Sequence, residues 1–158
     1  MTADGSSKVY YKSPIGWLEI TGIIQGIQTI RFVERRRKDT KDPPVCVELC
    51  RKQLDDYFQG TGTTFAVPLS VSGTPFQKAV WRRLLEIPYG EIMTYGEVAK
   101  AIDRPHAAQA VGQASNVNPV PILVPCHRVV GARGHLVGYG SGLWRKEWLL
   151  EHEGLSVQ

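Results

Sequence analysis

Apolar and polar residues alternate in short runs over the first part of the chain, as they do in β-strands. Residues 9–33 are rich in β-branched and aromatic side chains, and turn residues interrupt them at 13–16 and at 22–26. This pattern predicts a small antiparallel sheet. A further apolar run at 65–69, set among glycines and threonines, predicts one additional short strand and a linker.

A helical period follows the predicted sheet. The two prolines at 43 and 44 are expected to open a helix that ends near Gln59. Its apolar stripe is expected to pass through Val45, Leu49 and Tyr57.

The second part of the chain is helical in pattern. The segments 74–77 and 94–97 carry a capping box, in which a threonine precedes a helix and a glutamine or glutamate follows three residues later. Helices are predicted over about 75–87, 95–102, 105–115 and 143–152. The second and third of these are joined by Asp103 and Arg104 alone, which indicates a helix-turn-helix.

The chain is therefore predicted to be an α+β protein with a domain boundary near Ser72. Its 158 residues suffice for two small cores. Residues 1–72 would form a supporting domain, a small antiparallel sheet with one helix. Residues 73–158 would form a mostly helical domain.

Composition and charge exclude several classes of protein. No apolar run approaches the roughly 18 residues of a membrane span, and the first eight residues lack the apolar core of a signal peptide, so that the protein is expected to be intracellular. The formal charge of +4 permits a polyanionic partner without requiring one. The one basic run, at 35–38, is interpreted as a solvated loop.

Two of the three cysteines are interpreted as packing residues. An odd and small number of cysteines favours reduced thiols over a disulfide framework. Cys46 and Cys50 lie one turn apart on the first predicted helix, but no third metal ligand lies near them in the sequence. We therefore expect no metal there.

The third cysteine has a different setting. Cys126 ends an apolar run, 119–125, that contains three prolines, and it precedes His127 and Arg128. Because proline fixes φ and removes a backbone donor, this run predicts a stiff buried loop rather than a helix or central strand. The neighbouring basic groups would favour a nucleophilic thiolate, while a cysteine that only packs is the alternative that the residue types leave open.

The tetrapeptide Pro125-Cys126-His127-Arg128 resembles the active-site motif of the O6-alkylguanine-DNA alkyltransferases, the methylated-DNA–protein-cysteine methyltransferases. The resemblance extends over residues 73–154 through motifs in the family's order, at 76–81, 87–91, 94–99, 107–112, 118–119, 138–139 and 146–154. The first half matches weakly, at 13–16. The resemblance implies a ribonuclease-H-like first domain and a winged helix-turn-helix in the second.

The resemblance implies repair of DNA by direct reversal. The Cys126 thiolate would take the alkyl group from O6-alkylguanine irreversibly, once per molecule, without a cofactor. His127 would accept the thiol proton through a bound water, and Glu153 would orient His127. Asn118 would brace the loop before Cys126, and Tyr95 would donate to N3 of the base.

The same resemblance places the guanine pocket at the glycine-rich loop 138–142. Glycine lets the backbone approach a ligand closely. The implied substrate-binding residues are Val129, Tyr139, Gly140, Ser141 and Lys146. Lys146 is equally compatible with an ordinary surface lysine.

The predicted helix at 105–115 carries small side chains, which suits a helix that enters the minor groove while the damaged nucleotide is flipped out. An alanine-rich helix packed closely on its neighbours would have the same composition. Relatives usually carry an arginine where this chain has Gln109, so we expect weaker flipping. The implied DNA-binding residues are Tyr95, Arg104, Ala107, Ala108, Gln109, Ala110, Gly112, Gln113 and Arg128.

Two rival functions remain open. Alkyltransferase-like proteins bind and flag alkylated DNA without transfer, but they typically lack the nucleophile that Cys126 provides here. A thiol hydrolase would use Cys126 and His127, but no recognisable oxyanion loop supports it. The expected partner is double-stranded DNA containing O6-alkylguanine, and the protein is expected to be a monomer, in the cytoplasm of a prokaryote or the nucleus of a eukaryote.

Overall fold

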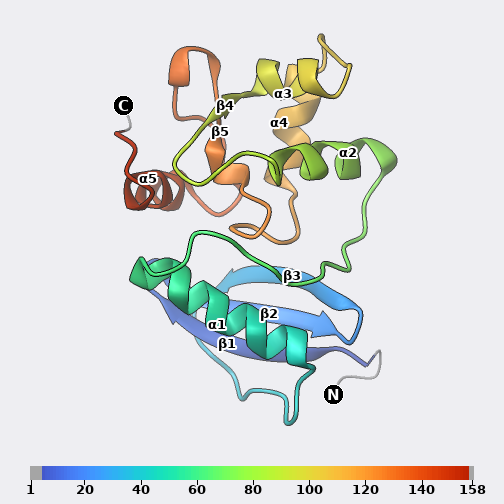
Figure 1. The fold of residues 1–158 in the computed structure, drawn as a ribbon, viewed down its shortest axis with the longest axis vertical. Coiled ribbons are helices and arrows are strands. Elements are labelled where there is room, and N and C mark those ends of the chain that lie inside the picture. Colours follow the sequence, from blue (N-terminus) through green and yellow to red (C-terminus); the bar gives the residue numbers. More distant parts are fainter. Residues whose placement is uncertain (1–4, 157–158) are drawn as a thin grey trace. The chain divides into compact units, whose positions relative to one another are not determined.

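The chain divides into two compact units, Met1–Ser72 and Gly73–Gln158, and the computed structural model describes residues 5–156 (Figure 1). The first unit is an antiparallel sheet of β1 (Ser7–Ser13), β2 (Gly16–Ile23) and β3 (Gly26–Val33), in that order, with helix α1 (Val45–Gln59) packed against it. The predicted sheet and helix are confirmed. Their shared core contains Val9, Leu18, Ile20, Ile30, Val47 and Leu54.

The predicted stripe on α1 is correct at Tyr57, which is buried, and wrong at Val45 and Leu49. Val45 is 83% exposed and Leu49 is 39% exposed. The buried side of the helix contains both cysteines, because a free thiol packs as a small apolar group. Its buried residues are Cys46, Val47, Cys50, Leu54, Tyr57 and Phe58.

The strand predicted at 65–69 is reduced to one bridge. Leu69 pairs with Ile27 in parallel, the Ile27 amide donates to the Pro68 carbonyl (2.9 Å), and the Ser70 amide donates to the Ile27 carbonyl (2.8 Å). Pro68 has no N–H to donate, so the ladder does not extend through it.

The second unit is mostly helical, as predicted. Its helices are α2 (Pro75–Leu84), α3 (Tyr95–Ala101), α4 (Ala108–Asn116) and α5 (Leu143–His152), and α2 packs on both α3 and α4. Both capping boxes form. The threonine side chain accepts from the backbone of the third helical residue, and the side chain of that residue accepts from the threonine N–H.

Helix α4 begins three residues later than predicted. Asp103 adopts a left-handed conformation (φ 60°), and the chain turns tightly there before α4 begins at Ala108. The helix-turn-helix is thus formed by α3 and α4, and residues 102–107 connect them in place of the two residues predicted.

Two further features position the site. Strand β4 (Met93–Thr94) pairs in parallel with β5 (Val129–Val130), which follows a 3₁₀ turn at Cys126–Arg128. This pairing was not predicted, because two-residue strands leave no periodicity in a sequence. A second 3₁₀ turn lies at Ala132–Gly134. Within residues 5–156, no helix has the length and apolar character needed to span a membrane.

Candidate active site

Cys126 lies at the first position of the 3₁₀ turn and is 5% exposed. Every residue from 120 to 130 is buried, which confirms that the proline-containing segment is a buried loop. The side chain of Asn118 joins the two ends of this loop: its Nδ2 donates to the Val124 carbonyl (2.8 Å), and its Oδ1 accepts from the Val120 amide (3.0 Å). The sulfur is therefore held on a fixed backbone.

Next to Cys126, the ring of His127 is fully buried and bound to Glu153. The Nε2 of His127 lies 2.7 Å from Oε2 of Glu153, which comes from the end of α5. The Nδ1 atom is buried and makes no hydrogen bond with residues 5–156. A carboxylate at Nε2 selects the tautomer in which Nε2 carries the proton, and Nδ1 is then a free acceptor.

Glu153 is itself held by two further partners. The guanidinium of Arg128 donates to both carboxylate oxygens, from Nε (2.8 Å) and from its second amino group (3.0 Å), and the backbone N–H of Gly90 donates to Oε1 (3.0 Å). Burial alone would raise the pKa of Glu153, but the hydrogen bonds from His127 and Arg128 outweigh burial and lower it. The carboxylate is thus ionised at neutral pH.

The pKa values of Cys126 and His127 leave both groups neutral at rest. Burial raises the pKa of the Cys126 thiol, and the Asn118 amide and the charge of Lys146 only partly oppose this. Burial also lowers the pKa of His127, against the opposing effect of Glu153. A protonated thiol next to a neutral imidazole is the starting state for proton removal by a base.

Lys146 is fully buried, so its interpretation as a surface lysine is wrong. Its Nζ donates to the carbonyls of Val129 (2.6 Å), Val137 (2.8 Å) and Gly138 (3.0 Å). Burial lowers its pKa to about 8, and the thiolate form of Cys126 would raise it. Lys146 is therefore predominantly charged at neutral pH and joins the Cys126 segment to the glycine-rich loop.

Two tyrosines complete the surroundings of the sulfur. The hydroxyl of Tyr95 donates to the Val137 carbonyl (3.1 Å) and lies 3.4 Å from Nζ of Lys146. The hydroxyl of Tyr139 is buried and makes no hydrogen bond of ordinary geometry within residues 5–156, although it lies close enough to Cys126 to affect its pKa. Burial raises the pKa of both phenols, so both remain proton donors at neutral pH.

The glycine-rich loop passes close to the end of α4. A side chain at position 140 would meet the carbonyl oxygen of Asn116 at 2.6 Å, so only glycine fits. Gly138 has a positive φ of 61° and lies beside the Tyr95 hydroxyl. The loop therefore brings Gly140 and Ser141 to the same part of the unit as Tyr95.

Helix α4 presents a mixed surface. Gln109 and Gln113 are exposed, Ala108, Ala110 and Gly112 are partly exposed, and Val111, Ala114 and Ser115 are buried in the core. The interpretation of α4 as a closely packed helix is thus confirmed for its buried side, while entry of its exposed side into the minor groove stays a prediction. Ala107 is the N-cap of α4, and Arg104 is exposed in the turn that precedes it.

The comparisons with known proteins agree for both units of the chain. Residues 8–71 match the family model of the 6-O-methylguanine DNA methyltransferase ribonuclease-like domain, and residues 75–155 match that of the DNA binding domain. A methylated-DNA–protein-cysteine methyltransferase of Methanosarcina acetivorans is 47% identical in an alignment of 150 residues that covers 91% of this chain and 96% of that protein. This chain belongs to the methylated-DNA–protein-cysteine methyltransferase family.

Solved structures of family members have the same fold. The crystal structure of Mycobacterium tuberculosis O6-methylguanine methyltransferase has a TM-score of 0.83 at 44% identity, covering 94% of this chain and 92% of that one. A structure of the M. tuberculosis protein in complex with DNA has a TM-score of 0.82 at 45% identity, covering 91% and 90%. The predicted family, fold class and DNA partner are thereby confirmed.

Sequence reasoning missed two parts of this methyltransferase site. Arg128 was expected to tie the two domains together or to contact DNA, but it is 6% exposed and its donors are taken by Glu153 and by the Ile87 carbonyl (2.7 Å), both in its own unit. The N–H of Gly90, which also holds Glu153, had no assigned role. The sequence did contain an indication of these roles, because Ile87 and Gly90 belong to the motif at 87–91, one of those that carry the resemblance.

Proposed function

We propose that this protein repairs O6-alkylguanine in double-stranded DNA by transferring the alkyl group to Cys126. The observation that carries the proposal is the buried Cys126 next to His127, whose Nε2 is fixed by Glu153 at 2.7 Å while Nδ1 remains an available acceptor. The family relationship supports the same reaction, because the M. acetivorans relative is named a methylated-DNA–protein-cysteine methyltransferase.

The first step is activation of the thiol. His127 accepts the thiol proton at Nδ1 through a water molecule, and the resulting imidazolium is stabilised by Glu153. The buried carboxylate is already ionised and held by Arg128, so no reorganisation is needed when the positive charge forms. Asn118 and Lys146 favour the thiolate.

The second step is displacement at carbon. A bond forms between Sγ of Cys126 and the alkyl carbon, and the bond from that carbon to O6 breaks. The Tyr95 hydroxyl donates to N3 of the base to stabilise the departing guanine. The alkyl group ends on sulfur, guanine leaves with the electron pair of the broken bond and takes up one proton from water, and His127 returns the thiol proton to water.

The flipped base would lie between the Cys126 segment and the glycine-rich loop. Val129, Tyr139, Gly140, Ser141 and Lys146 are proposed to line it. Lys146 already joins the Val129 and Gly138 carbonyls, so it fixes the two walls of this pocket relative to each other. The charged Lys146 also stabilises negative charge on sulfur.

The exposed side of α4 is proposed to enter the minor groove. Its partly exposed Ala108, Ala110 and Gly112 permit close approach, and Gln109 and Gln113 offer amides to the bases. Tyr95, Arg104 and Ala107 are proposed to contact the same duplex. Gln109 lacks the charge of the family's usual arginine, so the flipping step is proposed to be weaker.

The chemistry of the alkylated cysteine implies that each protein molecule reacts once. An S-alkylcysteine is a thioether without a leaving group, and a second thiol adjacent to Cys126 is absent from the sequence. Each molecule therefore acts once. We further propose that it acts as a monomer and, since its substrate is DNA, inside the cell.

Intact-protein mass spectrometry tests the proposal. The full chain is incubated with excess duplex that contains one O6-methylguanine, beside the Cys126→Ser variant. Wild type gains the mass of one methylene group and stops, and the variant gains nothing. Binding without a mass change would instead show a protein that flags lesions, and release of product beyond one equivalent would show a hydrolase.

A further inference from the structure

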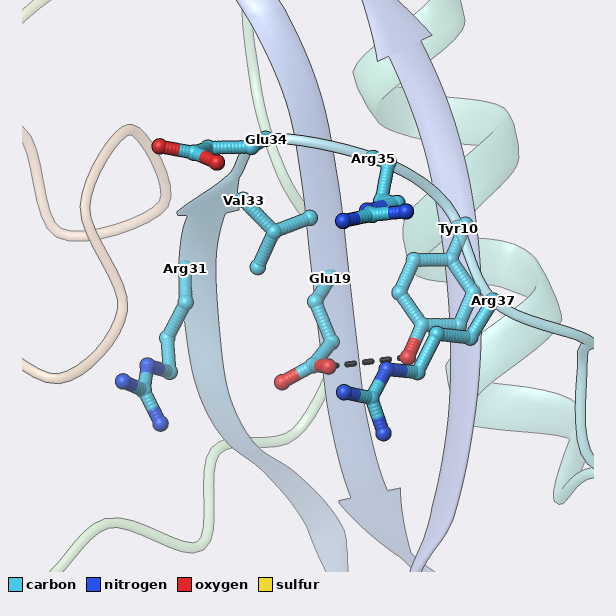
Figure 2. Close-up of a pocket in the computed structure, with 7 residues that line it drawn as sticks. All are labelled: Tyr10, Glu19, Arg31, Val33, Glu34, Arg35 and Arg37. Atoms are coloured by element: carbon cyan, nitrogen blue, oxygen red, sulfur yellow. Dashed lines mark hydrogen bonds between the residues drawn. The ribbon is translucent and has the colours of Figure 1, made fainter.

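A hollow of about 410 Å³ lies on the N-terminal unit, and none of the residues assigned to catalysis lines it. Figure 2 shows Arg31 on one side of it and Arg35 and Arg37 entering from the connection that follows β3, while Glu34 extends away from the three guanidinium groups. The lining residues are Tyr10, Glu19, Arg31, Val33, Glu34, Arg35 and Arg37.

Strand register explains why Arg31 faces the hollow. Tyr10 on β1 pairs with Glu19 on β2, and Glu19 pairs with Arg31 on β3, so these three side chains form one row across a single face of the sheet. In an extended chain, every second residue faces the same side. Strand β3 ends at Val33, and Arg35 and Arg37 reach the hollow from the irregular segment that follows it (Figure 2).

The arginine between them is oriented differently. The guanidinium of Arg36 lies over the ring of Trp17 (5.6 Å) and 3.7 Å from Oδ1 of Asp39. All four residues of the basic run, 35–38, are exposed, as predicted, although Arg36 also contacts Trp17 and Asp39. Arg36 is bound by its own loop and sheet, while Arg35 and Arg37 face the hollow (Figure 2).

The acid at the base of the hollow is already neutralised. The Tyr10 hydroxyl donates to Glu19 (2.8 Å), and Nζ of Lys8 forms an ion pair with it (3.2 Å). Burial alone would raise the pKa of Glu19, but these hydrogen bonds and the charges of Lys8 and Arg31 lower it, so it is ionised. Its single negative charge is thus offset mainly by Lys8, at 3.2 Å, and to a smaller extent by its cross-strand neighbour Arg31.

The three arginines around the hollow carry charge that the protein does not neutralise at close range. Across residues 5–156, no carboxylate lies within ion-pair distance of Arg31, Arg35 or Arg37. A guanidinium presents a planar fork of donors that fits the oxygens of a phosphate, and it is the group of choice for binding phosphodiesters. The hollow offers three of them.

We propose that the hollow formed by Arg31, Arg35 and Arg37 binds phosphate groups, and that the backbone of duplex DNA supplies them. The inference rests on DNA as the partner, but it assigns a DNA contact to the unit that sequence analysis regards as a support. Phosphate contacts carry no sequence information, which suits a protein that scans DNA for rare lesions.

The salt dependence of DNA binding tests this inference. The full-length Arg35→Ala/Arg37→Ala variant is compared with wild type on an unmodified duplex between 0.05 and 0.5 M salt (about the range in which counterion release is resolved). Log affinity falls as log salt rises, and removing one arginine–phosphate interaction makes this slope less steep by about 0.9. Such a change corresponds to about eightfold in affinity for a tenfold change in salt. For the double variant we expect a slope that is less steep than that of wild type by about 1 to 2.

The Arg36→Ala variant is the matched control. It removes the same charge from the same loop, but its guanidinium is already held by Asp39 and Trp17, so its slope should stay near that of wild type. Thermal unfolding of each variant verifies the fold. Equal slopes for the double variant and wild type would overturn the proposal.

A second experiment distinguishes duplex DNA from free phosphate as the ligand of the hollow. Thermal unfolding of wild type and the double variant is measured in inorganic phosphate and in chloride at equal ionic strength. Stabilisation of wild type alone by phosphate, together with an unchanged DNA slope, would reject DNA as the source. Methyl transfer to Cys126 is measured separately, so a failure of the repair reaction is distinguishable from a failure of this inference.

Discussion

Replacing Glu153 by glutamine removes one charge at the centre of the buried network and almost nothing of its shape. In the structure, Oε1 accepts from the Gly90 amide and from Nε of Arg128, and Oε2 accepts from Nε2 of His127 and from the second amino group of Arg128. A glutamine oxygen retains one of these pairs. Its NH₂ group then faces the other two donors.

The cost follows from the hydrogen bonds that the glutamine cannot make. Two hydrogen bonds to a charged group, each contributing about 1.5–3 kcal/mol, disappear, and Arg128 remains buried without its counter-ion. We expect the free energy of unfolding to fall by about 3–5 kcal/mol, the range for removing one partner of a buried ion pair. The exposed Glu151 on the same helix provides the control Glu151→Gln, with an expected change below about 0.5 kcal/mol.

The Glu153→Gln substitution should also slow methyl transfer, for a reason that is independent of stability. With an NH₂ group at its Nε2, His127 is stable in the tautomer that carries its proton on Nδ1, and Nδ1 can no longer accept the thiol proton. Loss of a general base costs about 10²–10⁴ in rate. Single-turnover methyl transfer from an O6-methylguanine duplex, measured where the variant is fully folded, should therefore slow at least about 100-fold.

The pH dependence provides a further check. The folded-state pKa of Glu153 is lowered, so its stabilising effect is complete above the unfolded pKa of about 4.3 and is lost as pH falls through the folded value. The stability difference between wild type and Glu153→Gln in urea titrations should be constant at neutral pH and shrink below about pH 4. A variant with wild-type stability and wild-type transfer rate would refute this account of the network.

Three further predictions concern residues around this network. Asn118→Ala removes both hydrogen bonds that brace the loop, so unfolding free energy should fall by about 1–3 kcal/mol and transfer should slow, and an unchanged urea midpoint would contradict the bracing role. Tyr95→Phe removes the proposed donor to the base and should slow single-turnover transfer about 10–100-fold at near-wild-type stability; equal rates would exclude that role. Gln109→Arg should tighten duplex binding and steepen its salt slope by about 0.9, and unchanged DNA affinity and repair rate would show that the missing cation does not limit flipping.

Local patterns in the sequence were sufficient for most of the fold. The capping boxes at Thr74 and Thr94 define the starts of α2 and α3, because they act within four residues. Features set by tertiary contacts were not predictable in this way. The buried side of α1 depends on which face meets the sheet, and β4 pairs with β5 across more than thirty residues of chain.

The candidate site shows the same difference between features set by local sequence and features set by tertiary contacts. The prolines before Cys126 predict its buried loop from local chemistry alone, whereas the pairing of His127 with Glu153 joins residues 26 positions apart and could be anticipated only from the family's motifs. The burial of Arg128 and Lys146 was not anticipated, because a charged residue in a sequence gives no sign of partners that arrive from α5 or from a loop.

Mapping the transferred methyl group among the three cysteines tests the central claim most directly. Wild-type protein is reacted to completion with O6-methylguanine duplex, digested, and sequenced by fragment-ion mass spectrometry. The account predicts one methyl group per molecule, all of it on Cys126, with Cys46 and Cys50 unmodified in their buried positions on α1. A methyl group on either of those two cysteines, or none on Cys126 after complete reaction of the lesion, would contradict it.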